Sequence, residues 1–337
     1  MAIRIIKNDK IWMEAEAIQQ VERFARFDGV INAIGLPDLH SGKVPVGTTF
    51  QTKDVVYPFL IGNDIGCGMT LFDTNIKYKK FDLDKFCKKL ENTSINGEYS
   101  IGGGNHFAEL QCIEKIYNKE VASQLHLDKT HLMLLVHSGS RSFGECVYRK
   151  FASTEGLVVG TERFDTYMKA HEEAVLFAKE NRNGVADALM DLIGIKYHNE
   201  VLVDCNHNVV EEHDGYFYHH KGSISAYHEY AIIAGSRGEY SYVVKCLKNE
   251  ETLYSLSHGA GRKWPRGLCK GRLTDKYKKD EIKTTFMGGR VITNQTELIY
   301  EEASEAYKNI EEVIHILLDH NCIELVAQLK PLVTYKC

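Results

Sequence analysis

Apolar residues recur at helical spacing in two parts of this 337-residue chain. Between Glu162 and Arg182 they follow the repeat of an amphipathic helix, which predicts one long helix with a single buried face. The apolar face consists of Phe164, Tyr167, Met168, His171, Ala174, Val175 and Ala178. The segment Glu297–His320 has a similar pattern, and we expect it to be helical at least from Ala303 onward.

Short β-rich runs elsewhere end in polar, glycine-containing turns. Examples are HLMLLVHSGS (131–140), VLVDCNHN (201–208) and AIIAGSRG (231–238). A strand that ends in such a turn is a common way to present functional side chains from a rigid scaffold. Because helices and short strands are mixed without regular β–α–β alternation, the pattern predicts an α+β fold.

Composition adds bounds on the class of protein. Hydrophobic residues make up 44% of the chain and charged residues 26%, and only five prolines occur, as in ordinary globular proteins. Since no Pro-, Ser- or Gly-rich linker divides the sequence, we expect one domain over residues 1–337. There is no apolar run of membrane-spanning length and no resemblance to a signal peptide, so we expect a cytoplasmic protein that does not associate with membranes.

Nine cysteines stand at irregular spacings without a CxxC pair. An odd number in this arrangement argues against a disulfide framework and against a Cys-rich zinc module. Free thiols suit a reducing cytoplasm, and we expect most of these side chains to be small buried hydrophobic groups.

Charge is unevenly distributed along the chain. The net charge is −5, which does not indicate nucleic-acid binding by itself. However, residues 262–279 carry eight Lys or Arg against one Asp, and residues 297–312 have the opposite balance. Such asymmetry can confine a polyanion site to one face, although two solvated surfaces would give the same pattern.

Four strand-to-turn junctions offer side chains that bind metals. Asp64 and Cys67 share one glycine-containing turn, and the other junctions carry His106, His137 and His207. Each alone could be a capping or buried residue, but together Asp, Cys and His favour a metal site for zinc, manganese or iron. We expect His213, His219 and His220, in a polar hairpin, to be exposed, and His40 is left open.

The stretch SLSHGAGR places His258 before a Gly-Ala-Gly turn and Arg262. Its backbone N–H groups and the arginine could surround a phosphate. A neutral imidazole can attack phosphorus if its other nitrogen is held by an acceptor. A fifth metal ligand is the alternative, and no GxSxG motif supports a serine hydrolase.

Taken together, the motifs resemble those of the RtcB-type RNA ligase family. PDLHSGKVPVG, DIGCGM, GGGNHFAE, HSGSR, NHN, AGSRG, SHGAGR and EAYK occur in this order from Leu36 to the C-terminal end. The resemblance implies a single α+β domain of that family's own type around a central dinuclear manganese site.

The resemblance also implies roles for individual residues. Asp64, Cys67, His106, His137 and His207 would bind two Mn²⁺ ions, with the Cys67 thiolate bridging them. His258 would be the nucleophile that becomes guanylylated, and Asp38 would orient its ring. The GTP site would draw on Asn105, Glu109, Asn208, Ser236, Ser241, Gly259, Ala260, Gly261 and Arg262, with Tyr307 and Lys336 reaching the guanine.

The implied activity is GTP-dependent joining of RNA 3′-phosphate or 2′,3′-cyclic phosphate ends to 5′-hydroxyl ends, for RNA repair or tRNA splicing. The alternatives are a manganese-dependent RNA cyclic phosphodiesterase or phosphatase without guanylylation, and a non-catalytic protein that binds RNA ends. The natural RNA, the oligomeric state and the need for an activating protein partner stay open.

The chain departs from the family pattern at a few positions. Pro265 stands where the family often has a small hydroxylated residue. Ala234 replaces a proline that commonly opens a PGSMG loop, and Arg237 replaces its methionine. The chain is also short for the family. These changes spare the metal set and the nucleophile, and we expect them to affect the RNA-end preference and the nucleotide contacts.

Overall fold

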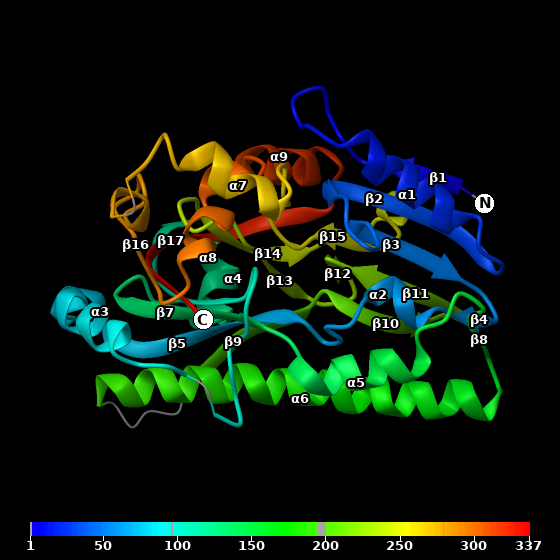
Figure 1. Ribbon diagram of the computed structural model, residues 1–337, viewed down its shortest axis with the longest axis horizontal. Helices are drawn as coiled ribbons and strands as arrows, with labels where there is room; N and C mark the ends of the chain where they lie inside the picture. Colours follow the sequence, from blue (N-terminus) through cyan, green and yellow to red (C-terminus); the bar gives the residue numbers. More distant parts are fainter. Residues whose placement is uncertain (1, 96, 195–199, 279) are drawn as a thin grey trace.

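Two β-sheets contain most strands of the described chain (Figure 1). The computed structural model describes residues 2–95, 97–194, 200–278 and 280–337. The larger sheet has the order β13 (Tyr230–Ile233), β14 (Ser241–Cys246), β17 (Ile323–Lys336), β6 (Phe107–Ile116), β7 (His131–Ser138), β5 (Gly68–Lys77) and β9 (Glu200–Asn206), with β16 (Arg290–Thr293) also paired to β17. The smaller sheet has the order β1 (Ala2–Ile5), β2 (Val30–His40), β3 (Val46–Thr52), β11 (Tyr216–Lys221) and β10 (Asn208–His213).

Short strand pairs complete the β structure: β12 (Ser223–Ser225) with β15 (Ser255–Ser257), and β4 (Val55–Val56) with β8 (Leu157–Val158). The α-helices of the described chain are α1 (Ala15–Ala25), α2 (Pro58–Ile61), α3 (Leu83–Glu91), α4 (Lys119–Gln124), α5 (Arg141–Phe151), α6 (Glu162–Ile193), α7 (Arg266–Leu273), α8 (Thr296–Glu301) and α9 (Ile310–Asp319). Short 3₁₀ turns are η1 (Tyr78–Lys80), η2 (Glu250–Thr252), η3 (Glu281–Lys283) and η4 (Ser304–Ala306).

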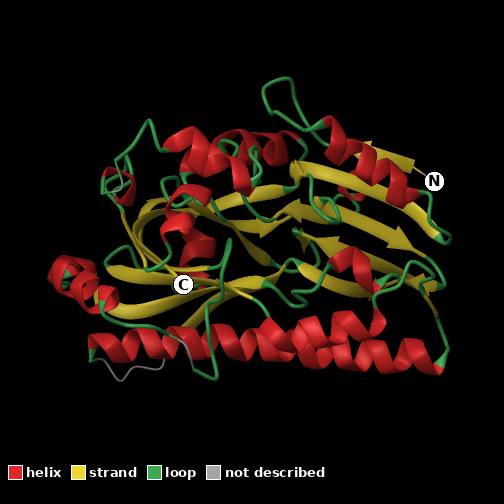
Figure 2. Ribbon diagram, viewed as in Figure 1, coloured by secondary structure: helices red, strands yellow, loops and turns green. Residues whose placement is uncertain are grey.

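Figure 2 shows α6 running along one side of the molecule beneath both sheets, with α1, α7 and α9 on the opposite side. Most strand pairs are antiparallel, and β1–β2 and β16–β17 are parallel. The fold is therefore α+β, as the sequence predicts. The prediction of a single domain over residues 1–337 stays a prediction.

The long helix predicted for residues 162–182 is α6, which continues to Ile193. The Thr161 hydroxyl accepts a hydrogen bond from the Phe164 N–H at the start, and Gly194 ends the helix in the left-handed conformation. The predicted apolar face, including His171, is largely buried. No helix of the described residues is both long and apolar enough to cross a membrane.

The expectation of continuous helix from Ala303 onward is wrong. Helix α8 ends at Glu301, η4 follows, and α9 starts only at Ile310. The cause is a contact distant in sequence: the N–H of Lys308 donates to the Gly261 carbonyl, and the Lys263 N–H donates to that of Ala306. These bonds hold the backbone around Tyr307 away from helical geometry.

The expected hairpin at residues 211–220 is present as β10 and β11, but the predicted exposure of His219 and His220 is wrong. Both rings are buried, because β11 pairs with β3 as well as with β10. The His219 Nδ1–H donates to the Phe50 carbonyl, and the His219 Nε2 accepts a hydrogen bond from the Tyr57 N–H. His213 is half-buried.

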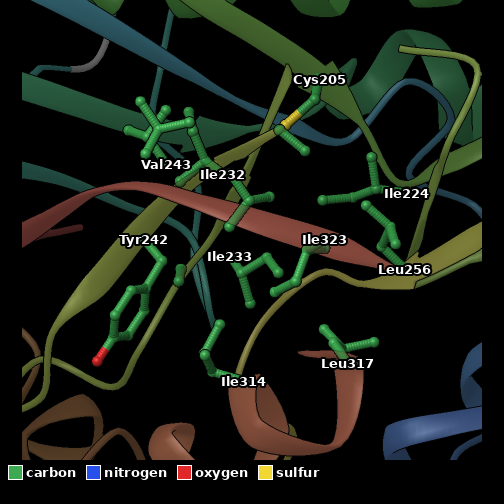
Figure 3. Close-up of a cluster of buried hydrophobic side chains, with 14 of the residues drawn as sticks. Cys205, Ile224, Ile232, Ile233, Tyr242, Val243, Leu256, Ile314, Leu317 and Ile323 are labelled. Carbon is green, nitrogen blue, oxygen red and sulfur yellow. The ribbon is translucent and has the colours of Figure 1, made fainter. Parts of the chain in front are cut away.

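The main hydrophobic core lies between the larger sheet and α9 (Figure 3). Ile314 and Leu317 of α9 and Ile232 and Ile233 of β13 are almost fully buried in it. Other strands contribute Cys205, Ile224, Tyr242, Val243, Leu256 and Ile323. Burial on this scale anchors α9 against the larger sheet.

A charged side chain, Arg182 of α6, lies fully buried against the larger sheet. Its guanidinium hydrogen-bonds the Thr70 hydroxyl, the Gly66 and Ser138 carbonyls, and the side chains of Asp204 and Asn206, over 2.8 to 3.1 Å. An uncompensated buried charge costs several kcal/mol. All three guanidinium nitrogens of Arg182 have partners here, so the charge is compensated by groups from several separate turns.

We predict that Arg182→Met lowers the free energy of unfolding by about 3–5 kcal/mol, because the substitution leaves Asp204 without its buried partner. Urea denaturation of the full chain measures this. Lys179→Met is the matched control on the same helix: Lys179 is exposed and its Nζ lies 3.8 Å from Asp204, so its loss should cost less than about 1 kcal/mol. Equal losses would contradict the assignment.

Candidate metal centre and nucleotide pocket

Antiparallel pairing brings distant candidate ligands to one end of the larger sheet. Strand β7 lies between β5 and β6 and is antiparallel to both, so these two strands begin where β7 ends. The register places His137 opposite both Met69 and Phe107. Cys67 and His106 directly precede β5 and β6, and they therefore lie beside His137.

The remaining two candidate ligands come from adjoining turns. His207 connects β9 of the larger sheet to β10 of the smaller one, and its N–H donates to the Cys67 carbonyl at 2.8 Å. Asp64 lies in the turn after α2, and its carbonyl accepts from the Cys67 N–H at 3.2 Å. The site thus forms at the junction of the two sheets.

Two groups of possible metal ligands share the Cys67 thiol. One contains Cys67, His137 and His207, and the other Asp64, Cys67 and His106. The Cys67 Sγ lies 3.3 Å from the Nε2 atoms of both His106 and His137. The Nε2 atoms of His137 and His207 are 3.2 Å apart, and the Asp64 Oδ2 lies 2.8 Å from the His106 Nε2.

The chemistry of these donors fits bound cations. Burial, together with neighbouring positive groups, lowers the pKa values of His137 and His207, so both imidazoles are neutral and can offer lone pairs. The His207 Nδ1 is buried without a partner among the described residues. Burial also raises the pKa of Cys67, an effect that a coordinated ion reverses. Sulfur, imidazole and carboxylate together suit zinc, manganese or iron.

Arg182 fixes the backbone beside three of these ligands. The Gly66 carbonyl that it binds directly precedes Cys67. The Ser138 carbonyl follows His137, and the Asn206 side chain precedes His207. One guanidinium thus orients three turns that would otherwise move separately, in the manner of residues that support a metal site from behind.

Two cations next to the donors, Arg141 and Lys221, were not among the predicted site residues. Arg141 starts α5 with a left-handed φ of 56° and donates to the His106 Nδ1 at 3.0 Å. A Cβ at Gly102 would lie 2.1 Å from the Arg141 guanidinium carbon, which explains one glycine of the GGG run. Burial lowers the pKa of Lys221, opposed by the charges of Cys67 and Asp64.

His258 follows β15 and is held by Asp38 of β2. The Asp38 Oδ2 accepts from the His258 ring Nδ1 at 2.7 Å and from its backbone N–H at 3.2 Å. This contact fixes the ring and leaves Nε2 as the nitrogen available for chemistry. The His258 and His207 ring centroids are 4.7 Å apart, so the ring lies directly beside the donor groups.

Asp38 is completely buried, and its backbone is fixed on both sides. Lys308 donates to the Pro37 and Leu39 carbonyls at 3.0 and 2.6 Å, and burial lowers the Lys308 pKa to about 8. Gly261, at φ +70°, packs so closely that a Cβ would lie 2.2 Å from the Asp38 carbonyl oxygen. The second glycine of HGAG is therefore a packing requirement.

A cavity of about 1080 Å³ adjoins these groups and is large enough for a nucleotide together with part of a second substrate. All five candidate metal ligands and His258 line it. The predicted pocket residues that line it are Asn105, Glu109, Asn208, Ser236, Gly259, Ala260, Gly261, Arg262, Tyr307 and Lys336. Asp38 and Ser241 do not line it. The Ser241 hydroxyl lies behind the wall and accepts from the Gly235 N–H at 3.3 Å.

Glu109 lies in the wall of this cavity with its carboxyl buried. Thr334 and Gln111 donate to its two oxygens at 2.5 and 2.6 Å. Burial raises the Glu109 pKa to about 7, although these hydrogen bonds and the charge of Lys336 act in the opposite direction. Near neutral pH the group can therefore either accept or donate a hydrogen bond.

Glu302 is a buried pocket residue that the sequence reasoning missed. Arg262 donates to it at 3.0 Å, Tyr307 at 2.5 Å and Lys336 at 3.4 Å. Burial alone would raise the Glu302 pKa, but Lys336, Arg262 and Arg266 together lower it. The Arg262 guanidinium is thus directed at Glu302 in this structure. Nothing in the acidic stretch YEEAS distinguishes this glutamate from the neighbouring Glu301.

The basic and acidic runs noted in the sequence face each other. Lys270 pairs with Glu297 at 2.8 Å, and Lys276 pairs with Glu305 at 3.1 Å. Arg262 and Arg266 share Glu302 as described. The basic run is therefore partly neutralised by acidic side chains of the same chain and is not an isolated positive patch.

Comparison with known proteins decides the family. Residues 20–99 and 96–337 match the family described as tRNA-splicing ligase RtcB. The chain belongs to the RtcB family. It is 39% identical to the RNA-splicing ligase RtcB2 of Escherichia coli strain ATCC 25922, over 99% of this chain and 96% of that protein.

More distant relatives agree with this assignment. The RNA-splicing ligase RtcB of Escherichia coli K12 is 26% identical over 97% of both chains. The tRNA-splicing ligase RtcB of Pyrococcus furiosus is 28% identical over 69% of this chain and 29% of that protein. The RtcB-type fold predicted from the motifs is thereby confirmed.

The positions at which this RtcB-family chain departs from the common pattern have structural consequences. The Ala234 N–H donates to the His258 carbonyl at 3.2 Å, a bond that proline could not make. Arg237 is buried and donates to the Ile282 carbonyl at 3.0 Å, and burial lowers its pKa to about 10. Pro265 precedes α7 with φ −58° and ψ 141° and provides no side-chain cap.

We predict that Glu109 makes stability pH-dependent. Because its folded pKa of about 7 lies above the ordinary 4.5, the folded state binds the proton more tightly. Stability is therefore lost as the pH rises through this range. The unfolding free energy of the wild type relative to Glu109→Gln should fall by roughly 3 kcal/mol between about pH 4 and pH 8. If chemical denaturation shows that the difference in unfolding free energy between the two proteins does not change with pH, the raised pKa of Glu109 is contradicted.

Proposed function

We propose that this protein joins RNA 3′-phosphate or 2′,3′-cyclic phosphate ends to 5′-hydroxyl ends, using GTP, two Mn²⁺ ions and a histidine–GMP intermediate. The observation that carries the proposal is the His258 ring, held by Asp38, beside two donor groups that share Cys67 in one cavity. The names of the relatives, RNA-splicing and tRNA-splicing ligases, support RNA as the substrate.

Asp64, Cys67 and His106 would bind one Mn²⁺ ion, and Cys67, His137 and His207 the other. When bound, the ions supply positive charge that neutralises phosphate oxygens. Arg141 and Lys221 add fixed positive charge to the same wall of the cavity. The negative charge of a triphosphate would thus be neutralised at one wall of the cavity.

His258 is the nucleophile of the first step. Its Nε2 attacks the α-phosphorus of GTP, the new P–N bond forms, and the bond to the bridging oxygen breaks so that pyrophosphate leaves. Asp38 accepts the Nδ1–H hydrogen bond throughout, which stabilises the positive charge that develops on the ring. Glu109, Tyr307 and Lys336 provide hydrogen-bonding groups for the guanine.

Transfer of GMP to RNA breaks the P–N bond. An oxygen of the RNA 3′-phosphate attacks the His258-bound phosphorus, and the neutral imidazole leaves with the lone pair. The RNA 5′-hydroxyl oxygen then attacks the activated 3′-phosphate, its proton passes to solvent, and GMP leaves. A 2′,3′-cyclic end is opened by water to the 3′-monophosphate beforehand.

We predict that GTP labelled at the α-phosphate, with Mn²⁺, labels the protein through an acid-labile bond. His258→Ala should abolish the label, and His126→Ala, at an exposed histidine, should retain it. Asp38→Asn should slow labelling by about 10²–10⁴-fold, because it favours the wrong tautomer of the ring. Labelling of the His258→Ala variant would overturn the assignment of the nucleophile.

We also predict that the wild type seals a cleaved RNA carrying a 3′-phosphate and a 5′-hydroxyl, with GTP consumed, and that Cys67→Ala does not. Gel electrophoresis of end-labelled RNA measures this. A protein that opens the cyclic phosphate without labelling or sealing would instead be a phosphodiesterase on the same fold.

A further inference from the structure

Three imidazoles outside the cavity converge on one carboxylate. The His213 Nε2 lies 3.0 Å from the Glu211 Oε2. The Nε2 of His220 lies 3.9 Å from the same oxygen, and that of His228 lies 3.9 Å from the Glu211 Oε1. None of these four residues lines the cavity described above.

The sheet register places the donors on one face. Glu211 and His213 are two residues apart on β10, so their side chains share a side of the strand. His220 of β11 pairs with Val209, which lies on that side too. His228 lies in the turn after β12, and its backbone N–H donates to the Ser225 carbonyl. Three segments thus direct side chains at one point.

Neighbouring groups orient the rings. The His220 Nδ1 is 3.2 Å from both the Thr49 and the Ser223 hydroxyls, so its Nε2 is the nitrogen turned to Glu211. The His213 ring stacks on Tyr227 with centroids 3.6 Å apart. Such support behind an imidazole is typical of metal ligands.

Hydrogen bonding accounts for only part of the arrangement, because the Glu211 carboxylate hydrogen-bonds the His213 Nε2 at 3.0 Å and the Ser225 side chain. A separation of 3.9 Å is too long for a hydrogen bond from His220 or His228 to Glu211. The His228 Nε2 is buried without a partner in the described chain. A cation between the carboxylate and the imidazoles would satisfy all of them at once.

We propose that Glu211, His213, His220 and His228 bind a Zn²⁺ ion at a second site, independent of the proposed ligase centre. Three imidazoles and a carboxylate form a donor set that suits zinc. The donors are farther apart than in the groups that share Cys67, so binding requires His213 to leave its stack on Tyr227 and His228 to turn inward. The His213 and His228 side chains are 27% and 33% exposed, which gives the ion access and the rings room.

The bound ion would tie the β10–β11 hairpin to the turn after β12. Because β10 begins at Asn208, next to His207, the second site would stiffen the strand that carries one ligand of the ligase centre. Its role is therefore structural, and guanylylation does not require it.

The test counts zinc on the full chain. Protein saturated with Mn²⁺ is dialysed against Zn²⁺, and bound metals are measured for the wild type, His213→Ala/His228→Ala, and the control His315→Ala at an exposed position. We expect one zinc per chain fewer in the double variant than in the other two, with labelling by GTP unchanged. Equal zinc content in all three proteins overturns the proposal.

Cobalt(II) gives a second, spectroscopic readout. The difference spectrum between the wild type and the single variant His228→Gln should show ligand-field bands without a thiolate charge-transfer band, since this donor set contains no sulfur. A difference spectrum that contains the thiolate band assigns the lost ion to the Cys67 centre and contradicts a separate site. Melting curves of the metal-free proteins establish that each variant folds.

Discussion

The fully buried guanidinium of Arg182 is the constraint on which the rest of the structure depends. It lies between α6 and the larger sheet and binds groups next to Cys67, His137 and His207. Removing such a charge from water is costly, and the cost is offset only while every partner keeps its position. Because every partner of Arg182 must keep its position, the network forms or is lost as a whole. The candidate metal ligands beside these partners are therefore held as one rigid unit, from the side opposite the cavity.

Because the candidate ligands are rigid, their distance from His258 on the cavity side depends on how the two sheets are placed. Four of the five candidate ligands lie at strand ends of the larger sheet and Asp64 lies in the turn after α2, whereas Asp38, which orients His258, comes from the smaller sheet. The distance between nucleophile and ligands is therefore set by how the sheets meet, at His207, and not by any single loop. Packing as close as that of Gly261 against Asp38 leaves little freedom for this distance to change.

Much of this arrangement could be predicted from the sequence, because motif residues lie next to strands with clear β patterns. The position of the candidate ligands at strand ends and the long helix were predicted in this way, whereas the Asp38–His258 pairing was implied by the resemblance to the RtcB family. Long-range contacts could not be predicted. The break around Tyr307 depends on hydrogen bonds to residues 261–263, the burial of His219 depends on pairing with β3, and Glu302 stands in an ordinary acidic run. Each depends on a partner far away in sequence, and local pattern carries no information about it.

The pairing of the basic run with the acidic one has a consequence for ionic strength. Lys270 and Lys276 already have Glu297 and Glu305 as counter-charges, so they hold fewer mobile anions than free lysines would. A polyanion that displaces these glutamates releases the cations condensed on its own phosphates, but the freed glutamates attract cations in turn, so the net number of ions released is smaller. Since the salt sensitivity of nucleic-acid binding reflects released ions, a polyanion bound along the basic run at residues 262–279 would dissociate less steeply with added salt than the number of basic residues in that run implies.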